Sequence, residues 1–494
     1  MTGPDRRDCR ATATAGAGGM SAEFGRGVGP GGRTQRRLAL LVAGSYFMEI
    51  LDGTVIAPAA PHIAADFGVP AVAVNVAVTA YVLTLAVLIP VSGWLTERYG
   101  ARRVYGTAIA VFTLASAGCA LAPSLGWLTA LRVLQGAGGA MMVPVGRLVV
   151  LRTTAKSQLI QAIAYLTWPA LIAPVVAPAL GGALSTYASW RWIFLINVPL
   201  GVAGLALAAR LVPDSRGAER RRLDWRGFTL TAVGVAALVV GLEDVGSATP
   251  DRALLVVVLP LAGVALALAV MHLLRSRSPL LDLRVLRIRT FRATASGGTV
   301  FRAVISAVPF LLPVFLQVGF GWNAAQAGGL LIALFVGNVA IKPLTTPAMR
   351  RFGIRPVIAA ATLASAACLL GIAALQASTP LTVMVVLLAL SGIFRSIGFS
   401  AYNSLAFADV DADRMSSANT LMSTVQELGS GLGVAVGALL VRVGGPLATV
   451  TGLGDGVDAS FRVAFVVLAA ALLISAAEAL SMPRDAGSAV TARS

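Results

Sequence analysis

Two acidic residues and one basic residue stand inside apolar stretches of the first half of the sequence. Glu49 and Asp52 lie three residues apart in one stretch, and Arg132 lies in another. Residues three apart share a helix face, so the two carboxyls would be neighbours. Because burial and a nearby carboxylate both disfavour ionisation, one of them is expected to exchange a proton near neutral pH. A structural acid paired with Arg132 or another base is the alternative.

The second half carries further ionisable residues in apolar stretches, and bases outnumber acids among them. Charged side chains at bilayer depth are costly unless they are paired or functional. If these residues line a cavity, they favour an anionic or zwitterionic substrate, whereas a structural pair of Glu427 and Arg395 is the alternative. The residues assigned to this substrate cavity are Arg302, Lys342, Arg395 and Glu427.

Other chemistry has little support in the sequence. The three cysteines are widely separated, and the two histidines, His62 and His272, are isolated, so no metal site is expected. No pairing of a nucleophile with a base and no phosphate-binding loop is present. We therefore expect neither an enzyme nor a cofactor, and an ion gradient rather than ATP as the driving force.

Composition indicates the elements that must position these residues. Hydrophobic residues make up 57% of the 494 positions and charged residues 12%, far from the proportions of soluble domains. The net charge of +17 comes from short arginine clusters between apolar segments, without the basic face and interleaved aromatics of a nucleic-acid binder. The chain is therefore expected to be an all-α polytopic membrane protein that binds no nucleic acid.

Apolar segments of spanning length, about 20 residues, occur fourteen times. They form six spans, an inserted pair, and six more spans. We expect them near 38–60, 72–92, 103–122, 126–149, 160–183, 192–212, 227–243, 253–274, 294–319, 325–346, 355–375, 381–405, 416–443 and 462–482.

Arginine and lysine gather in every second connection between these segments. Short cytoplasmic loops of membrane proteins collect these residues, so the alternation supports the count and predicts that both termini are cytoplasmic. The basic connections contain residues 98–103, 147–156, 216–222, 275–289, 350–355 and 414.

The predicted organisation is two six-helix bundles with two extra central helices. Residues 1–37, rich in Gly, Ala and Arg, are expected to be a disordered tail, with Met20 as an alternative start, and the Arg and Ala excess is typical of a bacterial source. The remaining parts are the bundle 38–212, a linker 213–226, the extra helices 227–274, a loop 275–293, the bundle 294–482 and a tail 483–494.

The connection Gly93-Trp-Leu-Thr-Glu-Arg-Tyr-Gly-Ala-Arg-Arg103 resembles the signature loop of the major facilitator superfamily, although the family usually has Asp where Glu97 stands. Gly93 would permit close helix approach and Gly100 a tight turn. The charges would form ion pairs that break and reform as the bundles rock, and an ordinary basic loop is the alternative. The residues of this gating loop are Gly93, Glu97, Arg98, Gly100, Arg102 and Arg103.

Two more motifs follow in spans four and five. Arg132-Val-Leu-Gln-Gly-Ala-Gly-Gly-Ala140 is similar to a family motif whose arginine is associated with proton transfer, with a side chain reaching the membrane surface as the alternative. Ala173 to Gly182 resembles the proline-glycine motif of antiporters, although Gly is common where Ala173 and Ala177 stand. Its prolines predict a kink and its glycines close packing, and generic helix packing is the alternative. The antiporter residues are Pro174, Pro178, Gly181 and Gly182.

Three further stretches, 51–61, 190–199 and 403–433, complete a resemblance to the fourteen-span drug:proton antiporter family of the EmrB/QacA type, from Leu38 to about Pro483. Two departures stand out. Ala57 and Pro58 replace a usual Asn and a non-proline residue, and Glu427 stands where glutamine is common.

The resemblance implies a monomeric antiporter of the inner membrane that exports drugs or other small organic molecules in exchange for protons by alternating access. Asp52 would correspond to the family's membrane-embedded aspartate. Alternatives are an exporter, importer or uniporter of an anionic metabolite with the same fold, and a membrane sensor that transports nothing.

Overall fold

The computed structural model describes residues 30–213, 222–246, 250–451 and 457–491, and every regular element in these ranges is a helix. Twelve helices are long and apolar enough to cross a membrane, and two further helix pairs, bent at a short break, bring the number up to fourteen if each pair is one span. The predicted all-α polytopic fold is confirmed. Helical hydrogen bonding within each segment suits lipid, which offers a backbone no partner.

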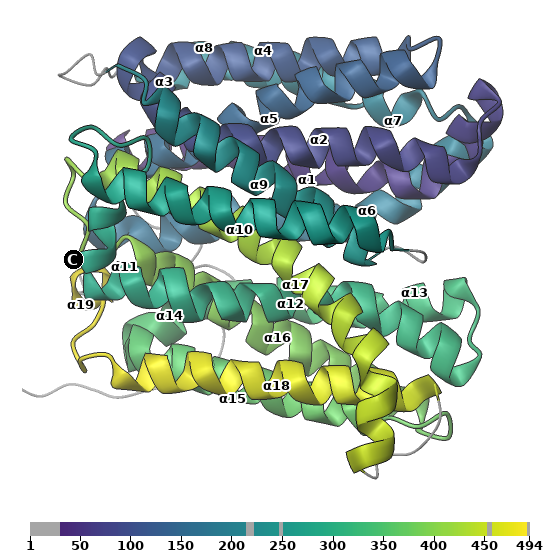
Figure 1. The fold of residues 1–494 in the computed structure, drawn as a ribbon. Helices are drawn as coiled ribbons and strands as arrows, with labels where there is room; N and C mark the ends of the chain where they lie inside the picture. Colours follow the sequence, from purple (N-terminus) through teal and green to yellow (C-terminus); the bar gives the residue numbers. More distant parts are fainter. Residues whose placement is uncertain (1–29, 214–221, 247–249, 452–456, 492–494) are drawn as a thin grey trace, which may run out of the picture.

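The first half lies at the top of Figure 1. Short helical turns lie in several of its connections, and the second span contains a 3-10 turn around Pro90. The elements are α1 Pro30–Phe67, η2 Ala71–Val74, α2 Asn75–Leu88, η3 Ile89–Val91, α3 Ser92–Tyr99, α4 Ala101–Ala120, α5 Leu125–Thr153, η4 Lys156–Gln158, α6 Leu159–Tyr187, α7 Trp192–Leu195 and α8 Asn197–Leu211.

The second half lies at the bottom of Figure 1. Its first span contains two π-helical segments, η6 and η7, and its second span is divided at Ile341. The elements are α11 Arg289–Ala293, η6 Thr294–Gly298, α12 Thr299–Val314, η7 Phe315–Gly319, α13 Ala324–Ala340, α14 Lys342–Phe352, α15 Ile354–Ala373, α16 Leu381–Ala406, α17 Met415–Thr451, α18 Val457–Ser481 and α19 Ser488–Thr491.

The inserted pair consists of α9 Trp225–Gly246 and α10 Arg252–Arg275, followed by η5 Leu283–Arg287. Helix α9 packs against α2 of the first half and α17 of the second, and α10 packs mainly on α9, so the pair crosses the seam between the halves (Figure 1). Large apolar side chains of α10 are exposed, among them Val256 at 73% and Val257 at 64%. A contiguous apolar surface of this kind suits a lipid-facing helix.

The observed helices follow the order of the predicted spans, and one difference lies at the start. Helix α1 begins at Pro30, so residues 30–37 of the predicted disordered tail are helical, while 1–29 lie outside the described residues. The extension has partners: Gln35 Nε2 donates to the Thr153 carbonyl at 2.7 Å, and Arg36 lies 5.9 Å from the ring centre of Tyr165.

The arginine-rich connections that the structure describes emerge at one end of the helices, which we call the basic end; α3, α14 and α19 mark it at the left of Figure 1. Gly100 and Gly353 end α3 and α14 there with φ angles of 88° and 83°, a conformation that favours glycine. The two halves contact each other at this end: α17 packs on α3, η3 and α5.

Candidate functional site

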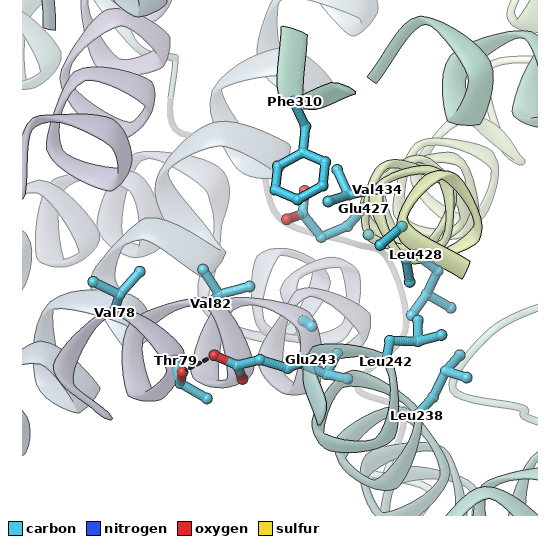
Figure 2. Close-up of a pocket in the computed structure, with 15 residues that line it drawn as sticks. Val78, Thr79, Val82, Leu238, Leu242, Glu243, Phe310, Glu427, Leu428 and Val434 are labelled. Atoms are coloured by element: carbon cyan, nitrogen blue, oxygen red, sulfur yellow. Dashed lines mark hydrogen bonds between the residues drawn. The ribbon is translucent and has the colours of Figure 1, made fainter. Parts of the chain in front are cut away.

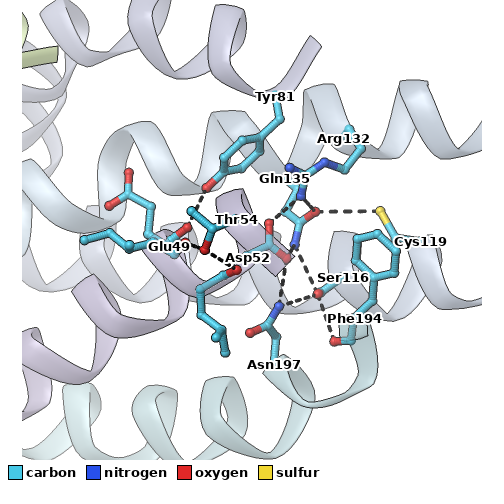
Figure 3. A network of polar contacts seen from close by, with 12 residues as sticks. Glu49, Asp52, Thr54, Tyr81, Ser116, Cys119, Arg132, Gln135, Phe194 and Asn197 are labelled. Carbon is cyan, nitrogen blue, oxygen red and sulfur yellow. Dashed lines mark hydrogen bonds and ion pairs between the residues drawn. The ribbon is translucent and has the colours of Figure 1, made fainter. Parts of the chain in front are cut away.

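A buried ion pair occupies the centre of the first half (Figure 3). Asp52 of α1 and Arg132 of α5 are both fully buried and joined by an ion pair. The other carboxylate oxygen of Asp52 accepts hydrogen bonds from Gln135 Nε2 at 2.8 Å and Asn197 Nδ2 at 2.9 Å. The structure therefore pairs two of the three residues that the sequence assigned to proton coupling.

The network extends beyond the charged pair. Ser116 of α4 contacts both amides, accepting from Gln135 and Asn197 at 3.1 Å each. The Arg132 guanidinium lies 3.9 Å from the centre of the Tyr81 ring, and its Nε and Nη2 have no hydrogen-bond partner in the described residues. The electron-rich face of the ring attracts the guanidinium and offsets part of the cost of burying its charge. Three of its five N–H donors therefore have no acceptor among the described residues.

Sequence reasoning missed these supporting residues. Gln135 lies three positions after Arg132, which places both on one face of α5, and that spacing was the available signal. Ser116 and Asn197 come from distant segments and carry no comparable signal. Close approach of the helices depends on glycine, because a Cβ at Gly138 would lie 2.8 Å from the backbone nitrogen of Phe112 in α4.

Glu49 lies beside this network but faces a cavity. The cavity has a volume of about 250 Å³ and is lined by α1, α2, η3, α5, α12 and α17; we call it the inner cavity. Glu49, Arg302 and Glu427 all line it. Arg302 donates from Nε to the Gln426 carbonyl at 2.9 Å and to Ser430 at 2.8 Å. The structure thus brings together one predicted coupling residue and two of the four predicted cavity residues.

The other two predicted cavity residues lie elsewhere. Lys342, at the bend between α13 and α14, is buried and donates to Ser400 Oγ at 2.6 Å and Thr167 Oγ1 at 3.3 Å. Arg395 borders a cavity of about 10 Å³ within the second half, beside Ser365 and Ser391. Neither residue lines the inner cavity. No ion pair joins Arg395 to Glu427 in the described residues.

Arg147 is a central contact that the sequence did not single out, because it was counted among the loop charges. It lies inside α5 and is buried. Its Nε donates to Asn419 Oδ1 at 2.7 Å, and its Nη1 donates to Gln426 Oε1 at 3.0 Å. Further bonds reach the Asn419 carbonyl and Ser423. All these acceptors are in α17, so Arg147 joins the two halves on the basic side of the inner cavity.

The predicted gating loop lies at the basic end. Gly93 is buried against α17, where a Cβ would collide with the Thr420 hydroxyl. The predicted ion pairs differ from those observed: none joins Glu97 to Arg98, Arg102 or Arg103 in the described residues. Arg98 instead lies over the rings of Trp94 and Tyr99, at 5.7 and 5.8 Å. Arg98, in the last turn of α3, is exposed, as are Arg102 and Arg103 at the start of α4.

The predicted antiporter motif lies in α6, which packs along α1. The segments Lys156–Pro174 and Ala179–Tyr187 meet at 46°, where the prolines predict a kink; the side chain of Pro178 lies outside the described residues. A Cβ at Gly181 would lie 2.6 Å from the Val55 carbonyl, whereas Gly182 has open space. One of the two glycines is therefore required for the contact between α6 and α1.

The comparisons with known proteins agree with this architecture. The family model described as Major Facilitator Superfamily matches residues 42–434 and, in a second match, 294–493. The chain belongs to the Major Facilitator Superfamily. It is accordingly a multi-pass membrane transporter and not an enzyme, as the sequence predicted.

Curated relatives and solved structures add detail. Proteins named "Putative multidrug resistance protein MdtD" are similar to this chain: one from Cronobacter sakazakii is 38% identical over 81% of this chain and 85% of its own length. Another from Serratia proteamaculans is 39% identical over 81% and 84%. The human organic anion transporter MFSD10 superposes with a TM-score of 0.62 at 14% identity, over 90% of this chain and 99% of its own. The proton:xylose symporter XylE gives 0.62 at 12%, over 92% and 97%. At these identities the two structures show the fold alone.

Proposed function

We propose that the protein is a proton-coupled antiporter that exports drugs or other small organic molecules by alternating access. The observation that carries the proposal is the Asp52–Arg132 pair, enclosed by hydrogen bonds and adjacent to a cavity that Glu49 lines. Breaking a buried pair leaves an uncompensated charge at considerable cost. Protonation of Asp52 therefore has to be coupled to movement of Arg132, and movement of α5 relative to α1 follows from it.

Glu49 provides a route for protons between the Asp52–Arg132 pair and the inner cavity. It lies three residues before Asp52 on α1 and lines the inner cavity, whereas Asp52 is fully enclosed. In the proposed cycle Glu49 receives the proton from the cavity and Asp52 holds it during the conformational change. In this cycle the contacts of Gly93 and Arg147 with α17 break when the two halves rock.

Export of drugs is supported by the relatives named for multidrug resistance. We infer for this chain the same substrate class, the bacterial inner membrane as its location and cytoplasmic termini. Topology reporters fused after Ser157 or Arg287 should read cytoplasmic, and those after Asp66 or Ser378 external, because the basic loops belong on the cytoplasmic side. An external reading at Arg287 would contradict this orientation.

Everted membrane vesicles test the coupling. Adding a transported dye to energised vesicles should release protons and accumulate dye, and an uncoupler should abolish both. Asp52→Asn should abolish gradient-driven uptake in a protein that still folds, because the amide keeps the shape but cannot titrate; Asp52→Glu should keep part of the activity. Undiminished uptake by the Asn variant would move the proton site to Glu49 or Glu427.

A specific anionic metabolite is the second candidate substrate. Arg147 and Arg302 both line the inner cavity, and guanidinium groups bind carboxylates and phosphates well. Competition between acidic compounds and a cationic dye for uptake into the same vesicles separates the two candidates.

A further inference from the structure

A second cavity lies between the inserted pair and the two halves (Figure 2). Its volume is about 350 Å³, within the range of small-molecule sites, and α2, α9, α12 and α17 line it. We call it the outer cavity, because it reaches Val78 and Thr79 near the end of α2 that lies opposite the basic end. Val82 and Glu427 line both cavities, so the two adjoin along the seam.

The walls of the outer cavity are apolar apart from two carboxylates and the Thr79 hydroxyl. Valine and leucine side chains from α2, α9 and α17 and the ring of Phe310 form most of the surface, and none of the described residues that line it is basic. The carboxylates belong to Glu427 of α17 and Glu243 of α9. Glu427 also borders the inner cavity beside Arg302. Glu243 has no such basic neighbour in the outer cavity.

The Glu243 side chain lines the cavity and is itself exposed. It accepts a hydrogen bond from the Thr79 hydroxyl of α2 (Figure 2). The next residue, Asp244, turns away and accepts from the backbone nitrogen of Asp251 at 3.0 Å. Arg442 of α17 is the base near the end of α9, and it donates to the Val245 carbonyl at 3.0 Å without an ion pair to Glu243.

We propose that Glu243 is a specificity-determining residue that binds the cationic head of an amphipathic substrate, whose apolar body lies along Val82, Leu242 and Phe310. The proposal rests on the transport function proposed above. A carboxylate beside an apolar cavity wall, with no basic partner among the described residues, favours a cationic ligand, and the exposed face of Phe310 adds a weaker attraction for it. Thr79 is a positioning residue that holds the carboxylate across the cavity.

The inserted pair thereby gains a role in recognition. Helices α9 and α10 lie outside the two six-helix halves, and α9 closes the seam between α2 and α17. Because it carries one of the two carboxylates of the cavity, the insertion changes the charge that a substrate meets at this seam. A transporter without the insertion would lack this contact.

Equilibrium binding to the purified full-length protein in nanodiscs tests the proposal without any proton gradient. The probes are ethidium, an amphipathic cation, and Nile red, an uncharged dye. Glu243→Gln should weaken ethidium binding roughly tenfold, equivalent to about 1.4 kcal/mol, and leave Nile red binding unchanged. Asp244→Asn, which removes a neighbouring carboxylate outside the cavity, should alter neither.

A cavity-filling variant gives an independent reading. A Cβ at Gly431 would meet nothing within 4 Å although the residue lines the cavity, so Gly431→Leu should fold and weaken binding of both dyes. Gly263→Leu on α10, also in open space, is the matched control.

Unchanged ethidium affinity in Glu243→Gln, an equal loss in Asp244→Asn, or no ethidium binding by the unaltered protein would overturn the proposal. Normal ethidium binding without proton-coupled uptake would instead overturn the transport proposal alone.

Discussion

The two halves have corresponding helices, but an arginine on the fourth span has an acidic partner in the first half and none among the described residues of the second half. Arg132 lies on α5, the fourth span of the first half, and pairs with Asp52 of the first span. Arg395 lies on α16, the fourth span of the second half, where the neighbouring first-span residues are Val304, Ile305 and Val308. Its Nη1 has no hydrogen-bond partner in the described residues. The two halves therefore share a fold but differ in the partners of this arginine.

Because only Arg132 has an acidic partner, we propose that the two halves have different functions. The first half contains an enclosed acid–base pair suited to holding a proton, whereas the second half contributes Arg302 and Glu427 to the walls of the cavities. Coupling then requires contacts between the halves. At the basic end α5 and α3 meet α17, and elsewhere α6 packs against α13, α14 and α16. Each of the following changes tests one side of this comparison.

The largest expected effect concerns Arg132, which is buried, and Arg395, which is half-buried. Arg132→Gln should destabilise the protein by about 3–5 kcal/mol, because it leaves Asp52 buried without its partner. Arg395→Gln should cost far less, since no acid depends on it. Thermal unfolding in detergent measures both, and the double change Asp52→Asn with Arg132→Gln should recover much of the loss. Equal destabilisation by the two single changes would refute the comparison.

The next effect concerns the contact of α3 with α17. Gly93→Leu should stop transport while dye binding persists, because its side chain collides with Thr420 and opposes movement of the halves. The control is Thr346→Leu, seven residues before Gly353 as Gly93 is before Gly100. Vesicle uptake and dye binding are compared for both. A parallel loss of binding and uptake in Gly93→Leu would indicate misfolding instead.

A smaller effect is expected at Arg147. Arg147→Gln removes charge-assisted hydrogen bonds to α17 and should shift the equilibrium toward a state that is open at the basic end. Spin labels at Gln158 and Asp411, in a variant without native cysteines, should report a larger population of long distances. Arg152→Gln, which changes a neighbouring arginine with no bond to α17, serves as the control. An unchanged distance distribution would show that Arg147 does not hold the halves together.

Much of the fold could be predicted from the sequence, and the site only in part. Apolar length and loop charge predict each span, because lipid imposes one requirement on every segment. Asp52 and Arg132 stand out because charge is rare in apolar stretches. Asn197 and Ser116 do not, since uncharged polar residues are common in helices and only packing reveals their partners. The positions of Lys342 and Arg395 away from the inner cavity depend on helix rotation, which a charge count does not contain.

The smallest effect concerns the charge of the substrate. It compares a base that lines the inner cavity with a base that lies away from it. Arg302 lines the inner cavity, whereas Lys342 is held by Ser400 and Thr167 away from it. If the cavity binds an acidic substrate, Arg302→Gln should weaken its export roughly tenfold, and Lys342→Gln should leave the preference between acidic and cationic substrates unchanged. Competition uptake in vesicles, with one acidic compound and one cationic dye, measures that preference in each variant. Because Arg302 also bonds to Gln426 and Ser430, Ser430→Ala controls for lost packing. If the Arg302 variant exports both compounds normally, Arg302 is structural and the acidic-substrate hypothesis is wrong.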